Sequence, residues 1–123
     1  MTCSAHVIDR NKMSRPSCII TSDNVIFSNR ESSFRQIFDV PEYRFDDISP
    51  GDRVLDIGAN VGAFCIRAAR FTSQVTAVEP VTSSILEENI RANNAAVTVI
   101  RGALGDGTPR EICWDDCRVR APT

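Results

Sequence analysis

Two acids lie at the ends of two successive short apolar runs, and two glycines lie between these acids. Asp56 falls within "VLDIG", and Glu79 follows "VTAV". Between these acids, Gly58 and Gly62 leave room for a sharp bend and for a ligand close to the backbone, while Asn60 is a residue type that tolerates left-handed backbone angles. Where such a bend leads into a helix, the free N–H groups of the helix favour a carboxylate or phosphate. The pattern predicts binding of a small molecule with an anionic end.

The spacing of these residues favours a nucleoside as the ligand. The dinucleotide fingerprint is G-x-G-x-x-G, whereas the order here is D-x-G-x-N-x-G, with Asn60 at the place of the second glycine. Glu79 follows Gly58 by about twenty residues, the position at which an acid hydrogen-bonds the hydroxyls of a ribose. A nucleoside is therefore predicted in preference to a pyrophosphate. The alternative is a tight strand-to-helix turn that binds no ligand.

Three apolar runs are predicted to be strands. A turn over residues 50–52 precedes the first run, Val54 to Ile57, which has the length of a buried strand. The second and third runs are "QVTAVEP" and "AVTVIRGAL". Between the first two runs, apolar residues recur at helical spacing from Gly62 to about Phe71, which places Arg67 and Arg70 on the other side of that helix.

A second helix is predicted at "TSSILEENIRANN", where Ser84 and Glu87 have the spacing of a capping box. Strands that alternate with helices in this way are typical of a parallel sheet built from right-handed crossovers. Outside this region, residues 25–27 are a predicted short strand, and residues 33–41 are a predicted short helix. The stretch "REICWDDCRVRAPT" is predicted to contain a fourth, shorter strand followed by a tail.

Three consecutive motifs carry a family resemblance. The segments "VLDIGANVG", "VTAVEP" and "VTVIRGALGD" resemble the first motifs of the class I S-adenosylmethionine-dependent methyltransferases, most closely the FkbM-type branch, over about residues 46–107. The resemblance implies a Rossmann-like, three-layer αβα fold of the α/β class with a mainly parallel sheet. It also implies S-adenosylmethionine as the methyl donor and an oxygen of a small metabolite or sugar as the methyl acceptor.

Nine residues are expected to bind the cofactor if the motifs are carried over position by position. The methionine part would be surrounded by Asp56, Gly58, Asn60 and Gly62. The ribose would be held by Glu79, with Pro80 and Val81 beside it. The adenine would be lined by Ala103 and Leu104. The charges agree, because the two acids suit an ammonium group and a diol respectively. No catalytic residue is assigned.

The chain departs from the family pattern after the third motif. Family members continue to a seven-stranded sheet, whereas these 123 residues supply about half of it. Residues 1–45 are expected to be an arm or a small helix and strand lead-in, and residues 46–123 the cofactor-binding half of a single domain. The chain is expected to be either a fragment or truncated product of a longer enzyme, or a short protein whose sheet is completed by a second copy or another chain. The other expected partner is a small-molecule methyl acceptor.

Composition narrows the class of protein further. The net charge is −2 with acids and bases interspersed, so no footprint for nucleic acid is expected. No window has the length and hydropathy of a membrane span, and no signal peptide is recognised, which predicts a cytoplasmic protein. The five cysteines are odd in number and irregularly spaced, so free thiols are expected. Neither Cys113 with Cys117 nor Cys3 with His6 has the spacing of a known metal module, and no metal is predicted.

Two other functions compete with methyl transfer. The chain could be a cofactor-binding module or a truncated, inactive relative of the methyltransferases that keeps the loop without the chemistry. It could also be half of a nicotinamide-dependent oxidoreductase, which Asn60 and the early acid Asp56 disfavour.

Overall fold

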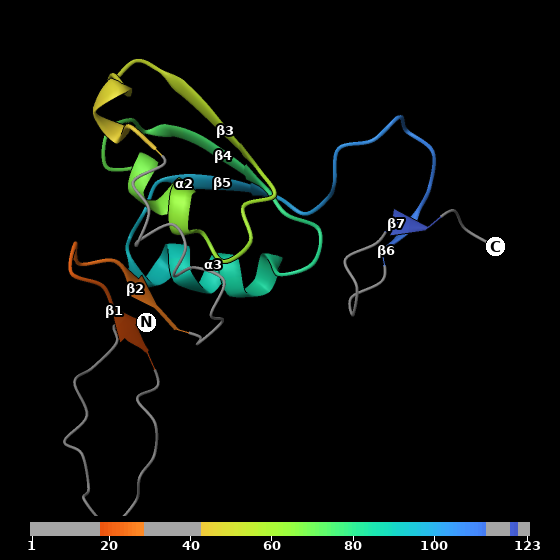
Figure 1. Ribbon diagram of the computed structural model, residues 1–123, viewed down its shortest axis with the longest axis horizontal. Helices are drawn as coiled ribbons and strands as arrows, with labels where there is room; N and C mark the ends of the chain where they lie inside the picture. The colour runs from red at the N-terminus through yellow and green to blue at the C-terminus, as the bar shows by residue number, and fades with distance from the viewer. Residues whose placement is uncertain (1–17, 29–42, 113–118, 121–123) are drawn as a thin grey trace, which may run out of the picture.

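The computed structural model describes residues 18–28, 43–112 and 119–120 of the chain. These residues form an α/β fold around a three-stranded parallel sheet, with two helices lying on one face of that sheet (Figure 1). The predicted α/β class and parallel sheet are therefore confirmed. The sequence-predicted short helix over 33–41 lies outside the described residues, as do Cys3, His6, Cys113 and Cys117.

The sheet consists of β3 (Arg53–Ile57), β4 (Gln74–Val78) and β5 (Val97–Ile100), in that spatial order. All three predicted strands are confirmed. Register places Leu55 beside Thr76 and Thr76 beside Thr98, so that each strand begins at the same end of the sheet. The carboxyl ends of the strands consequently meet at one edge, where ligands bind in open α/β sheets.

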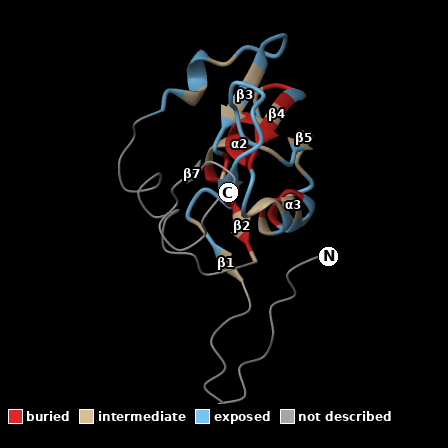
Figure 2. Ribbon diagram, turned by 90° about the vertical axis from the view of Figure 1, so that its right-hand side faces the viewer, coloured by how far each residue is buried: buried red, intermediate tan, exposed pale blue. Residues whose placement is uncertain are grey.

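Both predicted helices are present, and they cover the same face of the sheet. Helix α2 (Ala63–Ala68) is shorter than expected, because residues 69–71 form turns after its last residue instead of continuing the α-helix. Helix α3 (Ser83–Ala92) buries Leu86 and Ile90 on one face, as the helical spacing predicts. Figure 2 shows the buried residues gathered between the helices and the sheet.

An N-terminal hairpin completes this core. Strands β1 (Ile19–Ile20) and β2 (Ile26–Phe27) pair antiparallel, and β2 lies against α3. The predicted strand at 25–27 is thus confirmed, apart from its first residue. Val25 and Phe27 are fully buried in the same cluster as the residues of α2 and β4. This hairpin (residues 18–28) is therefore part of the core.

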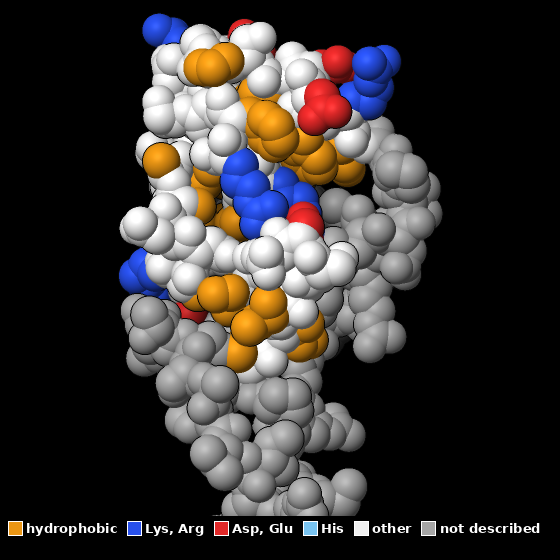
Figure 3. Space-filling view, turned by 90° about the vertical axis from the view of Figure 1, so that its left-hand side faces the viewer, with side chains coloured by type: hydrophobic (Ala, Val, Ile, Leu, Met, Phe, Trp, Pro, Cys, Tyr) orange, Lys and Arg blue, Asp and Glu red, His pale blue; other side chains and the backbone are white. Residues whose placement is uncertain are grey.

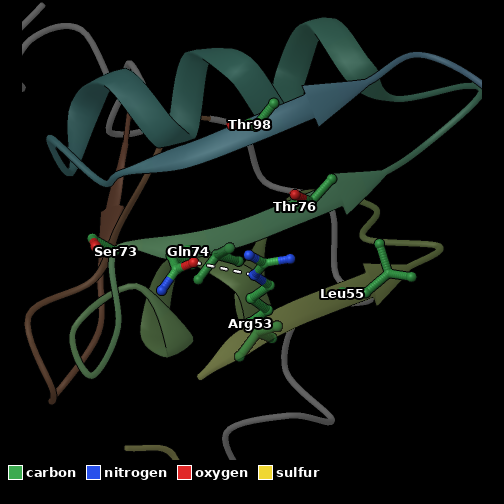
Figure 4. A pocket seen from close by; sticks show the side chains of 8 residues that line it. Arg53, Leu55, Ser73, Gln74, Thr76 and Thr98 are labelled. Atoms are coloured by element: carbon green, nitrogen blue, oxygen red, sulfur yellow. Dashed lines mark hydrogen bonds between the residues drawn. The ribbon is translucent and has the colours of Figure 1, made fainter. Parts of the chain in front are cut away.

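The opposite face of the sheet is open, which corrects the prediction of a buried first strand. Leu55 is 57% exposed and Ile57 53% exposed, because both described helices lie on the other face. Figure 4 shows Arg53, Leu55, Thr76 and Thr98 along this open face, where a cavity of about 310 Å3 lies near the start of the strands. Among the described residues, β3 is an edge strand that pairs only with β4.

The C-terminal residues that the structure describes (101–112 and 119–120) do not add a strand to the parallel sheet. Instead, β6 (Glu111–Ile112) and β7 (Val119–Arg120) pair antiparallel as a separate two-stranded sheet. The expected strand after the third motif therefore exists, but its partner is the end of the chain rather than the main sheet. A short 3-10 helix, η2 (Phe45–Asp47), precedes β3. Within the described ranges, none of the helices has the length and apolar character needed to span a membrane.

The expectation of free thiols is wrong at Cys18. Cys18 is disulfide-bonded, whereas Cys65 is a buried free thiol. Counting cysteines and measuring their spacing could not reveal this bond, because connectivity depends on which segments the fold brings together. Burial raises the pKa of the Cys65 thiol to about 12.

Candidate functional site

The bend between β3 and α2 has the left-handed backbone that its residue types predict. Gly58, Asn60 and Gly62 have φ values of 76°, 51° and 98°. The N–H groups of Gly58 and Ala59 both donate to the carbonyl oxygen of Val78, at 2.8 and 3.1 Å. The bend, called the glycine loop below (residues 58–62), is therefore fastened to the carboxyl end of β4.

The two glycines of this loop meet different surroundings. A Cβ atom on Gly62 would lie 2.9 Å from the Cδ1 atoms of both Ile66 and Leu86, closer than real side chains approach. A Cβ atom on Gly58 would meet nothing within 4 Å. Gly62 is thus required by the packing of α2 against α3, whereas Gly58 leaves open space beside the backbone.

Asp56 is the acid on the covered side of β3, beside α2. Among side chains of the described residues, its Oδ2 is the one buried oxygen or nitrogen atom without a hydrogen-bond partner. Burial raises the pKa of this carboxyl, and the charge of Glu79 raises it further, while a hydrogen bond from the Cys65 backbone N–H acts in the opposite direction. A buried carboxylate oxygen with no donor is costly, and a cationic N–H donor would satisfy it.

Glu79 is also buried, and the chain itself uses both of its oxygens. Oε1 accepts the N–H of Asn60 at 3.0 Å, and Oε2 accepts the N–H groups of Val81 and Thr82 at 2.7 and 3.1 Å. The side chain therefore joins the glycine loop to the start of α3. A carboxylate has about four acceptor positions, so three donors leave one of them for a ligand hydroxyl.

This arrangement replaces the predicted capping box. The residue before α3 is Thr82, which makes no side-chain capping bond, and Ser84 lies within the helix. Glu87 instead forms an ion pair with Arg101, with distances of 2.5 and 3.1 Å. The capping-box prediction was therefore wrong, and Glu79 accepts N–H groups just before the helix, those of Val81 and Thr82, rather than those of its first turn.

The remaining predicted site residues follow the carboxyl ends of β4 and β5. The N–H of Glu79 donates to the carbonyl oxygen of Ile100, so these two strand ends are joined directly. The residues beyond them are exposed at the surface: Pro80, Val81, Ala103 and Leu104. The structure therefore gathers Asp56 and Glu79 around the glycine loop, with apolar surface beyond the strand ends.

Two polar residues beside the loop escaped the sequence predictions. Arg67 was expected on the outer side of its helix, but it is buried and donates to Asp23 and to the Ala63 carbonyl. Asn89 is fully buried and donates to the Val61 carbonyl. A signal for Asn89 was present, because it falls at helical spacing from Leu86 on the face that the apolar residues define.

Two cavities of the described structure are lined by residues other than these acids. The cavity on the open face and a second one of about 370 Å3 near Arg70 and Asn93 include none of the predicted site residues. Figure 3 shows Arg side chains between groups of hydrophobic side chains on one side of the molecule. Comparison of the chain with protein-family models, curated proteins and solved structures gives no match.

Proposed function

We propose that the chain is an S-adenosylmethionine-binding domain of the methyltransferase type, with a Rossmann-like sheet of which the three parallel strands form part. The observation that carries the proposal is the partnerless Oδ2 of Asp56, buried at the start of the glycine loop. A ligand with an ammonium group would supply the donor that this oxygen lacks. The methionine part of S-adenosylmethionine has such a group.

The other residues of the site fit this cofactor in part. Glu79 keeps one acceptor position, which suits one ribose hydroxyl, although the two oxygens are otherwise occupied by backbone N–H groups. Gly58 leaves space beside the loop for the ligand to approach. Val81 and Leu104 present apolar surface on which an adenine ring can lie.

The cofactor, when bound, supplies an activated methyl group, so the protein needs mainly to hold the acceptor in line with it. The residues of this chain bind and orient: the loop fixes the methionine part, and the ends of β4 and β5 fix the nucleoside. We propose a small metabolite or sugar hydroxyl as the acceptor. The open face and free edge of the sheet support binding of a second copy or another chain that completes it.

A cofactor-binding module without catalysis is the second candidate. The open sheet favours it, because the two described helices cover only one of its faces and leave Leu55 and Ile57 exposed on the other. An oxidoreductase half is less well supported, because Asn60 occupies the place of the second fingerprint glycine and its N–H is already bonded to Glu79.

Calorimetry tests the proposal directly. We expect the protein to bind S-adenosylmethionine and S-adenosylhomocysteine but not NAD. Replacing Asp56→Asn removes the charge-assisted bond and is expected to weaken binding by about 1.5–3 kcal/mol, roughly 10- to 150-fold. As a matched control, Asp47→Asn changes an exposed acid remote from the loop and should leave the affinity unchanged. Binding of NAD alone, or equal affinities in the two variants, would contradict the proposal.

Stability provides a check that Asp56→Asn acts on the ligand. Because burial raises the pKa of Asp56, the ionised form is disfavoured in the folded protein, and stability falls as the pH rises through that raised pKa. The ligand-free variant should therefore be at least as stable as the wild type at neutral pH. Transfer of a radiolabelled methyl group to a metabolite extract then separates the two candidate functions, since a pure binding module would transfer none.

A further inference from the structure

The glycine loop is held from its far side by two buried side chains. The carbonyl oxygens of Val61 and Ala63, on either side of Gly62, accept hydrogen bonds from Asn89 Nδ2 at 2.7 Å and from Arg67 Nη1 at 2.6 Å. Both carbonyls are thereby fixed just where the loop becomes α2. The N–H of Gly62 bonds within the loop, to the Ala59 carbonyl, so Asn89 of α3 is the external support of the loop, while Arg67 bonds one turn back within its own helix, α2.

Asn89 connects this loop to the N-terminal hairpin. Its Oδ1 accepts the backbone N–H of Ser28 at 2.8 Å and the Ser28 hydroxyl at 3.0 Å. The fully buried amide of Asn89 therefore bonds to Ser28, at the end of β2, through its Oδ1 and to the glycine loop through its Nδ2. Because both ends of a buried amide must be satisfied, displacing either segment leaves an unpaired group in the core.

Arg67 makes a second connection of the same kind. Its Nε and Nη2 donate to the carboxylate of Asp23 at 2.6 and 3.0 Å, while Nη1 holds the Ala63 carbonyl. Asp23 lies in the turn between β1 and β2, and Arg70 also donates to its carbonyl oxygen at 2.7 Å. The turn and the end of the hairpin thus each reach one side of Gly62.

We infer that the N-terminal hairpin is a positioning element for the glycine loop, and that Asn89 and Arg67 are the positioning residues that transmit its placement. The hairpin contributes no atom to the proposed ligand site. Instead, it fixes where the carbonyl groups of the loop lie. The loop is thereby preorganised for a ligand. The role in ligand binding rests on the proposed function, whereas the mechanical role does not.

Asn93 offers a matched control on the same helix. Its Oδ1 accepts the N–H of Ile26 at 2.8 Å, and its Nδ2 donates to the Ile26 carbonyl at 2.7 Å, much as a neighbouring strand would. It therefore anchors the hairpin without bonding to the glycine loop, and its Nδ2 also donates to the backbone carbonyl of Asn89, one turn back, at 2.7 Å. Changing either residue to Asp keeps the size, introduces a charge and removes an Nδ2 donor.

Hydrogen exchange of the ligand-free protein tests the inference. In Asn89→Asp, a carboxylate oxygen replaces the Nδ2 donor and repels the carbonyl oxygen of Val61. The oxygen that accepts from Ser28 is kept. We expect the amides of Gly58, Ala59 and Gly62 to exchange about tenfold faster than in Asn93→Asp, with β4 amides alike in the two variants. The affinity for S-adenosylmethionine should likewise be about tenfold lower in Asn89→Asp.

Other outcomes overturn the inference. Equal loop exchange in the two variants, or acceleration spread evenly over β3, β4 and the loop, would show that Asn89 contributes only to general stability. If Asn89→Asp does not fold, Asp23→Ala in the exposed turn replaces it, with faster exchange of the loop amides as the expected result and unchanged exchange as the contrary one. Absence of S-adenosylmethionine binding by the wild type would reject the proposed function, but the exchange result would still decide the inference.

Discussion

At the residue scale, the two glycines of the loop should respond differently to the addition of one methyl group. We expect Gly62→Ala to lower the free energy of unfolding by about 3 kcal/mol or more, because the added carbon meets Ile66 and Leu86 at 2.9 Å and the φ of 98° disfavours any side chain. Gly58→Ala should cost about 1 kcal/mol, since only its φ of 76° opposes the change. Urea unfolding of both variants measures the difference, and equal losses would contradict this account of the loop.

The acids of the site show what residue types alone can predict. An acid near the end of one strand, a glycine two residues later and a second acid directly after the next strand placed Asp56 and Glu79 at one sheet edge, because parallel strands end together. Nothing in this pattern showed that Glu79 would bind three backbone N–H groups. A carboxylate can accept hydrogen bonds from a ligand or from backbone N–H groups of its own chain. Which of the two it does depends on the distances between its oxygens and those donors in the folded loop.

At the element scale, the turn of the hairpin depends on an ion pair that titrates. The hydrogen bond with Arg67 lowers the pKa of Asp23 from 3.8 to about 2. A lowered carboxyl pKa stabilises the fold above the unfolded value, and this stabilisation is lost as the pH falls through about 2. Asp23→Asn should therefore cost about 1 kcal/mol at pH 7, a modest loss because the Asp23 side chain is 42% exposed.

The pH profile distinguishes this pair from an exposed one. The gap in unfolding free energy between wild type and Asp23→Asn should close between about pH 4 and pH 2. Asp47→Asn, which breaks the exposed pair with Arg44, should change stability by less than about 0.5 kcal/mol at every pH. A gap for Asp23→Asn that stays constant on acidification would show that the ion pair is not its cause.

Local patterns predicted the elements better than their connections. Strands β3 to β5 and helix α3 follow from apolar spacing and from turn residues that act within a few positions. The attachment of β2 to α3 does not, because Asn89 and Asn93 bond to residues 61 and 67 positions away. An asparagine on an otherwise apolar helix face indicates a buried partner, but the sequence gives no means of choosing it.

At the scale of the whole molecule, the sheet has one finished face and one open face. The finished face is closed by α2, α3 and the hairpin, which share a single core. On the open face the exposed side chains change from Arg53 at the start of β3 to Ile57 at its end. Apolar side chains therefore gather toward the carboxyl ends of the strands, where a covering chain would bury the most apolar surface.

The last prediction asks whether the hairpin and the sheet unfold together. Phe27 is fully buried, so Phe27→Ala should lower the free energy of unfolding by about 3–5 kcal/mol, whereas Ile20→Ala, 59% exposed on the same hairpin, should cost less than about 0.5 kcal/mol. Cys65 lies on α2 and reports on the part of the core outside the hairpin, because its thiol is buried and has a raised pKa. Its alkylation, followed by peptide mass spectrometry, should become at least about a hundredfold faster in Phe27→Ala. Unchanged labelling of Cys65 despite a loosened hairpin would mean that the hairpin opens independently, and the core would then consist of the sheet and helices alone.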